Sequence, residues 1–191
     1  MPGAKVGHNE GVALSREKIL DTAFDVLRQF GLADLSMRRL ATELGVAPGA
    51  LYYHVKNKQE LLASLASRML ATVERPSTPA SPDTLLIIGE NTYRQLIPVK
   101  ECSEVIRLAL ALHPATLTPD RLALLDTLET DFAAATGTPQ PAQAAEIFMH
   151  TCLSLIEQEQ TRALLAGSTP PAEPPASYIS TLTAIIKGFT A

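Results

Sequence analysis

The sequence has little of what several large classes of protein require. Its 191 residues include no tryptophan and only two cysteines. Cys102 and Cys152 form no CxxC pair and have no histidine cluster beside them. Zinc and redox chemistry are therefore not expected, and buried free thiols are the simpler interpretation. We expect no metal and no cofactor.

Long apolar runs are also missing. No stretch reaches the roughly 18 uninterrupted apolar residues that a membrane helix needs. The run from Val105 to Leu112 is short and is interrupted by Arg107. The first fourteen residues lack the apolar centre of a secretory signal. These absences predict a cytoplasmic protein with no membrane partner.

Charge is distributed unevenly along the chain. The net charge is −4, yet residues 1–75 hold ten Lys/Arg against eight Asp/Glu, and the remainder holds six against twelve. An acidic average therefore hides a basic N-terminal part. This asymmetry favours a nucleic-acid partner on one side of the molecule only.

Apolar residues recur at helical spacing through nearly the whole chain, and alternating β patterns are absent. The first expected helix starts at the N-cap Ser15 and stops at Gly31, and Asn57 with Glu60 forms a capping pair that opens the fourth. The expected helices cover residues 15–30, 36–44, a short segment from 48, 57–73, 83–97, 101–113, 119–136, 141–166 and 178–189. The predicted fold class is all-α.

Proline divides the chain. Pro76, Pro79 and Pro82 fall within residues 75–83 and forbid a continuous helix there. We expect a flexible N-terminal tail over 1–14, a small helical domain over 15–74 and a larger helical bundle over 75–191. A second proline-rich segment, 167–177, precedes the last helix. It lies over a pocket, lies over a partner subunit, or is disordered.

The segment ATELGVAPGALYYHV has the form of a helix-turn-helix. Leu44 ends the first helix, Gly45 turns in the left-handed conformation without a Cβ penalty, and Val46 anchors the turn. Small residues at 47, 49 and 50 let the next helix approach another surface closely. An ordinary pair of helices within a bundle is the alternative at this point.

The residues around the motif favour DNA. Tyr52, Tyr53 and His54 donate to phosphate oxygens, and Lys56 and Lys58 supply attraction that does not depend on sequence. The start of the first motif helix adds further polar groups beside the same surface, namely Ser36, Arg38 and Arg39.

These residues carry a family resemblance. The stretch SMRRLATELGVAPGALYYHVKNKQELL, with its LYxHxxxKxxL core, resembles the DNA-binding signature of the TetR family of bacterial transcription regulators, and the likeness extends over residues 15–73. The resemblance implies a homodimer whose two DNA-binding domains enter successive major grooves of a pseudo-palindromic operator, about 34–36 Å apart. It also implies a ligand pocket in the second domain and dimerisation through the last two helices.

The resemblance assigns roles by position. Arg38 matches a position that contacts a base in relatives, and its guanidinium suits guanine O6 and N7, worth about 1–3 kcal/mol of discrimination. A solvated surface arginine is the alternative. The recognition helix carries no amide or charged side chain, so Ala47, Pro48 and Ala50 are left to contact thymine methyl groups. The phosphate-contacting positions are Ser36, Gly49, Tyr52, Tyr53, His54, Lys56 and Lys58.

The second domain is less informative. Polar residues on otherwise apolar helices are the ligand-binding candidates, with a solvated helix face as the alternative for each: Asn91, Arg94, Arg107 and His150. Aromatic residues make up only 5% of the chain, which disfavours a stacking pocket for flat cationic ligands. Glu157 lies near the position of a metal-binding carboxylate in the family, but His113 before Pro114 is no clear match for the histidine, so no metal site is expected.

Three functions remain open. The first is a transcriptional regulator, a repressor released from its operator by an unknown small-molecule effector. The second is a helical-bundle enzyme with His150 and Glu157 as acid and base, which lacks a nucleophile, a metal set or a phosphate-binding loop. The third is a constitutive DNA-binding module without an effector. The wide apolar arcs of helix 141–166 and of the last helix predict a homodimer.

Overall fold

The computed structural model describes residues 13–111 and 123–190, and within them it contains helices and no strand. The helices, in chain order, are α1 (Arg16–Phe30), α2 (Met37–Leu44), α3 (Pro48–Leu51), α4 (Lys58–Ala71), α5 (Pro82–Leu96), α6 (Cys102–Ala111), α7 (Ala123–Thr136), α8 (Pro141–Leu165) and α9 (Ala176–Gly188). The all-α prediction is confirmed. None of the described helices is both long and apolar enough to cross a membrane.

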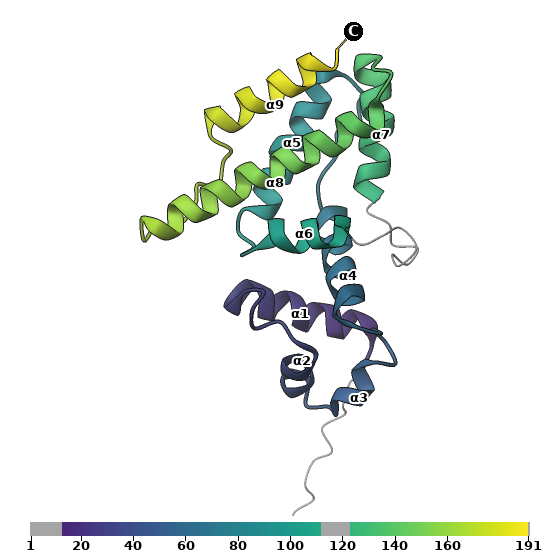
Figure 1. Cartoon of the computed structure of the whole chain (residues 1–191), viewed down its shortest axis with the longest axis vertical. Coiled ribbons are helices and arrows are strands. Elements are labelled where there is room, and N and C mark those ends of the chain that lie inside the picture. Colours follow the sequence, from purple (N-terminus) through teal and green to yellow (C-terminus); the bar gives the residue numbers. More distant parts are fainter. Residues whose placement is uncertain (1–12, 112–122, 191) are drawn as a thin grey trace, which may run out of the picture.

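The helices are arranged along one long axis (Figure 1). α1, α2 and α3 form one end, α8 and α9 lie toward the other end, and α4 runs between them (Figure 1). The buried apolar residues form one continuous cluster that extends from Ile19 in α1 to Ile186 in α9. Because α4 packs against both α1 and α6, a shift of either end is felt by the other through close-packed side chains.

Helix caps fall where the sequence predicts them. The Ser15 side chain accepts a hydrogen bond from the Lys18 N–H at 3.2 Å, and Gly31 ends α1 with φ at 88°. The Asn57 Oδ1 accepts from the Glu60 N–H at 2.8 Å, which confirms the capping pair at the start of α4. The α4 helix ends at Ala71, earlier than expected.

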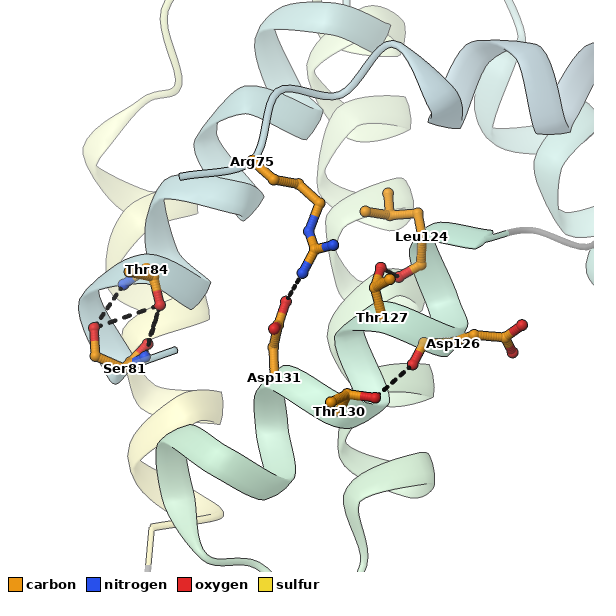
Figure 2. Close-up of polar contacts among 8 residues, drawn as sticks. All are labelled: Arg75, Ser81, Thr84, Leu124, Asp126, Thr127, Thr130 and Asp131. Atoms are coloured by element: carbon orange, nitrogen blue, oxygen red, sulfur yellow. Dashed lines mark hydrogen bonds and ion pairs between the residues drawn. The ribbon is translucent and has the colours of Figure 1, made fainter. Parts of the chain in front are cut away.

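The proline-rich segment before α5 is not helical, as predicted, and Pro82 is the first residue of α5. Ser81 and Thr84 cap this helix reciprocally (Figure 2): the Thr84 N–H donates to Ser81 Oγ at 3.2 Å, and the Ser81 N–H donates to Thr84 Oγ1 at 2.7 Å. The expected helix start at 119 lies outside the described residues, as do His113 and residues 1–12 of the expected tail. Leu14, also expected in the tail, packs against the core.

Helices α5, α8 and α9 approach one another closely at Gly89 of α5. A Cβ atom there would lie 2.4 Å from Leu182 Cδ1 of α9 and 3.0 Å from Phe148 Cζ of α8. The Tyr178 hydroxyl donates to the Gly89 carbonyl at 2.8 Å, and its ring meets the ring of Tyr93 edge-on at 4.9 Å. Only glycine allows this three-helix contact.

The chain itself covers one face of α9, so only part of the apolar arc that predicts a homodimer is left for a second subunit. Tyr178, Leu182 and Ile186 are buried within the chain, because α5 and α8 pack against this face. Their apolarity therefore needs no partner subunit. Ile179 and Ile185 of the same helix remain half-buried.

The proline-rich loop before α9 is held against α5. The Tyr93 hydroxyl donates to the Pro171 carbonyl at 3.0 Å, and Arg94 Nε lies 2.8 Å from Glu173 Oε2. Of the alternatives for this loop, the structure shows a position on the chain's own α5. Cys102 and Cys152 are buried free thiols, as predicted.

Candidate nucleic-acid interface and ligand pocket

The turn between α2 and α3 has the geometry that the sequence predicts. Gly45 ends α2 in the left-handed region, with φ at 66° and ψ at 31°. The Val46 N–H donates to the Ala41 carbonyl at 3.0 Å, which closes the turn, and the Val46 side chain packs against the core. This motif holds α3 at a fixed angle to α2.

Two neighbouring arginines of α2 have different environments. Arg39 Nε lies 2.7 Å from Glu43 Oε1, and its guanidinium stacks over the Phe30 ring at 4.6 Å. The Arg38 side chain is exposed and takes no hydrogen bond or ion pair within the described part of the chain. Arg39 therefore stabilises the packing of α2 against α1. The Arg38 side chain is left available to contact a binding partner.

The N-cap of α2 and the first residues of α3 are open to solvent. Ser36 is exposed, although its Oγ already accepts the Arg39 N–H at 3.1 Å as the helix cap. Ala47, Pro48 and Gly49 are exposed too, and a Cβ at Gly49 would meet no atom within 4 Å. Leu51 is buried and fixes α3 to the core. The outer face of α3 can therefore approach another surface very closely.

The residues after α3 continue this surface. Tyr53 is 91% exposed and Tyr52 is 49% exposed, so both phenols reach solvent. His54 is half-buried, and the side chains of Lys56 and Lys58 are exposed. Between residues 36 and 58 the chain carries four Lys/Arg and one Glu. A basic surface with outward phenols suits the phosphate backbone of a duplex.

A pocket of about 420 Å³ opens between α6, α7 and α8. Six of its lining residues are apolar and four are charged or titratable: Arg107, Leu110, Ala111, Leu125, Glu129, Ala142, Ala145, Glu146, Met149 and His150. The size is within the range of small-molecule sites. Among the described residues, no group of three or more His, Cys, Asp or Glu is arranged to hold a metal ion.

The four predicted ligand residues separate into two pairs. Arg107 and His150 both line the pocket. Asn91 and Arg94 lie on α5 away from it, where the Asn91 amide donates to the Glu74 carbonyl at 2.9 Å and Arg94 contacts Glu90 and Glu173. The structure thus brings together only half of the set.

The pocket also contains residues that the sequence analysis missed. Glu146 lies one turn before His150 on α8, and the His150 Nε2 is 3.9 Å from Glu146 Oε1. That spacing of four residues was visible in the sequence. Leu125 and Glu129 come from α7, and no local pattern could have placed that helix beside α8.

The acid–base pair of the enzyme alternative is not assembled. Glu157 Oε2 lies 2.5 Å from Arg107 Nη2, whereas the partner of His150 is Glu146. His150 and Glu157 therefore have different partners within the described residues.

Three polar contacts tie the pocket helices to the helix-turn-helix end. After α4, Arg75 forms an ion pair with Asp131 of α7 (Figure 2). At the start of α6, the Glu101 carboxylate accepts the backbone N–H of Leu32, and Lys100 Nζ donates to the Gln29 carbonyl at 3.1 Å. Both α6 and α7 line the pocket, so each of them joins the pocket to the other end of the molecule.

Fold and surface together define the class: an all-α protein with a helix-turn-helix at one end and a pocket-bearing helical bundle at the other. Residues 19–65 match the family model described as bacterial regulatory proteins, tetR family. The chain is also 46% identical over 70 residues to the class C tetracycline repressor protein of Escherichia coli. The helix-turn-helix part of the chain is therefore similar to the tetR family of bacterial regulatory proteins.

The sequence match is confined to the N-terminal part. It covers 37% of this chain and 32% of the class C repressor, so the chain matches about a third of that relative's length. Solved structures match over nearly the whole chain. BioQ of Mycobacterium smegmatis is 25% identical with a TM-score of 0.80 over 93% of this chain and 98% of that one. A structure of BioQ with its natural double-stranded DNA operator is 24% identical, with a TM-score of 0.77 over 94% and 99%.

Proposed function

We propose that this protein is a sequence-specific DNA-binding transcriptional regulator, a repressor that a small-molecule effector releases from its operator. It works in the cytoplasm as a homodimer on pseudo-palindromic double-stranded DNA. The DNA-binding domain comprises residues 15–74, and residues 75–191 bind the effector and the second subunit. The protein is not an enzyme.

One observation carries the DNA-binding part. The helix-turn-helix presents an exposed and unengaged Arg38 beside a strip of exposed phenols and lysines, while the neighbouring Arg39 is held by Glu43 and Phe30. Relatives with the same motif are named tetracycline repressor proteins. Lysines and phenols attract and orient the duplex, and a free guanidinium distinguishes its bases.

The dimer is supported by the outer surface of α8 and α9. Leu164 and Leu165, at the end of α8, are 78% and 83% exposed, and Ile147 is 39% exposed. Together with the half-buried Ile179 and Ile185 of α9, they leave apolar surface that a second copy would cover. Two-fold symmetry then matches the two half-sites of an operator.

The effector part rests on the pocket and its connections. An effector acts only if it binds one arrangement of the two DNA-binding domains more tightly than the other. The pocket between α6, α7 and α8 offers such a site, because α6 and α7 both pack against α4, and Lys100, just before α6, bonds to Gln29 of α1. A coupling of about 1–3 kcal/mol changes DNA affinity about 5- to 150-fold.

The DNA surface is tested by anisotropy titrations of a labelled duplex at several salt concentrations. Lys56→Ala and Lys58→Ala are each expected to weaken binding to all sequences and to lower the salt slope by about one. Light scattering on the same samples reports the dimer. Unchanged salt slopes in both variants would contradict the proposed surface, and a monomer at micromolar concentration would contradict the dimer.

A further inference from the structure

The charge around the pocket identifies the kind of ligand that it accepts. Arg107 is the one permanent cation among the described lining residues. Its Nη2 lies 2.5 Å from Glu157 Oε2 and 3.6 Å from Glu104 Oε2. Two carboxylates therefore surround one guanidinium, and Arg107 offers no net positive charge to an anionic ligand.

Two further carboxylates lie at the rim. Glu129 projects from α7, and Glu146 projects from α8, where it is 73% exposed. The one basic group facing either of them in the described lining is His150, whose Nε2 is 3.9 Å from Glu146 and which forms an ion pair only when protonated. With a neutral imidazole, the described rim residues carry an excess of negative charge, which attracts cations into a cleft.

The remaining lining residues are aliphatic or sulfur-containing. Met149 and Ala145 are buried at the base of the pocket, and Leu110 and Leu125 are half-buried beside them. No aromatic side chain is among the described lining residues. Such a base suits an aliphatic body, which gains free energy from lost apolar surface, and offers no ring for a flat ligand to stack on.

We propose that the pocket binds an amphipathic aliphatic cation. The aliphatic body lies against Met149 and Leu110, and the ammonium group lies at the rim near Glu129 and Glu146. This inference rests on the proposed function only in taking this pocket as the effector site. It adds the chemical class of the effector, and charge complementarity with the rim carries it.

Three probes with one chain length and different head groups separate charge from apolar contact. Decylamine, decanol and decanoate are titrated into the full-length protein by calorimetry, at low ionic strength and below micelle formation. Decylamine is expected to bind about tenfold more tightly than decanoate, with decanol between them. Equal affinities, a preference for decanoate, or no binding by any probe would overturn the proposal.

Matched variants assign the effect to the rim. Glu129→Gln and Glu146→Gln are each expected to weaken decylamine binding about two- to fivefold, the range for exposed ion pairs, and to leave decanol unaffected. Glu173→Gln is the control, because Glu173 is also 73% exposed but sits on the loop before α9. A loss of equal size in Glu173→Gln would contradict a site at this rim.

Operator binding is measured on the same samples, which separates the two claims. If decylamine binds the pocket without changing operator affinity, the pocket is not the effector site. The proposed ligand class would still hold. If decanoate releases the operator and decylamine does not, the proposed ligand class is wrong. The proposal that the protein is a regulator would still hold.

Discussion

The carboxylate of Glu101, at the start of α6, accepts a hydrogen bond from the backbone N–H of Leu32, in the turn between α1 and α2. Glu101 is the one described non-glycine residue with a positive φ, at 52°. A left-handed glutamate costs free energy, and such residues persist where other contacts fix them. A larger residue at position 31 is also disfavoured, since a Cβ there would lie 2.7 Å from Glu101 Oε2.

Through this contact, the two ends of α6 lie at different parts of the molecule. Its last residues line the pocket, while the residue before its first turn holds the segment that leads to the α2 cap at Ser36. A ligand that displaces α6 therefore displaces the α1–α2 turn, and DNA that fixes the turn must act back on α6 with the same free energy.

Glu101→Ala is expected to break this coupling. Glu101→Gln is the matched control, because its amide oxygen still accepts the Leu32 N–H while the charge is removed. In the wild type and in Glu101→Gln, operator DNA should slow hydrogen exchange of α6 amides. In Glu101→Ala the operator should still bind, but this protection of α6 should disappear, and the Leu32 amide should exchange faster. Full protection in Glu101→Ala would refute the coupling role.

Arg38→Ala is expected to relax sequence discrimination. Loss of a guanidinium–guanine contact costs about 1–3 kcal/mol for the preferred base, or about 5- to 150-fold, and much less for other bases. Competition between the selected site and its single-base variants measures this difference. Substitutions at 47–50 should change discrimination less than Arg38→Ala does. An equal loss for all sequences would show that Arg38 contacts only phosphate.

Arg39→Ala is the natural comparison for Arg38→Ala. It removes the Glu43 ion pair and the stacking on Phe30, both of which lie within the protein. We therefore expect a lower free energy of unfolding, by about 1 kcal/mol, with base preference retained. Changed base preference in Arg39→Ala would reverse the roles given to the two arginines.

Gly89→Ala is expected to destabilise the helical bundle. The new Cβ would meet Leu182 Cδ1 at 2.4 Å and must displace this buried side chain, a type of overpacking that costs about 1–3 kcal/mol. The melting temperature measured by thermal unfolding should fall by several degrees.

Gly49→Ala is the control for this substitution, because its Cβ would meet no atom within 4 Å. It should keep the free energy of unfolding and weaken DNA binding, since the methyl group separates α3 from the duplex. Equal melting temperatures for Gly89→Ala and the wild type would contradict the close helix contact.

The two thiols are expected to be unreactive in the native protein. Burial raises the pKa of Cys102 to about 11 and that of Cys152 to about 12, from an ordinary 9.0. Thiolate is the reactive form, so alkylation at pH 8 should proceed only as fast as the protein opens.

The same pKa shifts have a consequence for stability. Above pH 9 the unfolded chain loses thiol protons that the folded chain retains, so the free energy of unfolding falls as pH rises toward 11 and 12. Rapid native labelling of both cysteines would contradict their burial.

Local chemistry explains what the sequence could predict. Ser15, Gly45 and Asn57 act through neighbours three to five residues away, so spacing alone placed the helix ends and the turn of the motif. The residues of the DNA surface lie within one short stretch, and their exposure followed from that motif.

The pocket depends on contacts between distant segments. Arg107 and Glu157 lie 50 residues apart, and Glu129 reaches the site only because α7 packs against α8. Asn91 and Arg94 have the same polar character on an apolar helix, yet their partners lie elsewhere. Polarity on a helix therefore identified candidates but could not show which of them share a pocket.

Selection of bound sites from a random duplex pool, at one stated salt concentration, tests most directly whether this protein recognises a DNA sequence as a dimer. We predict an enriched pseudo-palindrome whose half-sites are about one helical turn, 10–10.5 base pairs, apart. A pool that shows no enrichment, with weak binding that disappears as salt rises, would leave only attraction to phosphate and would contradict this prediction.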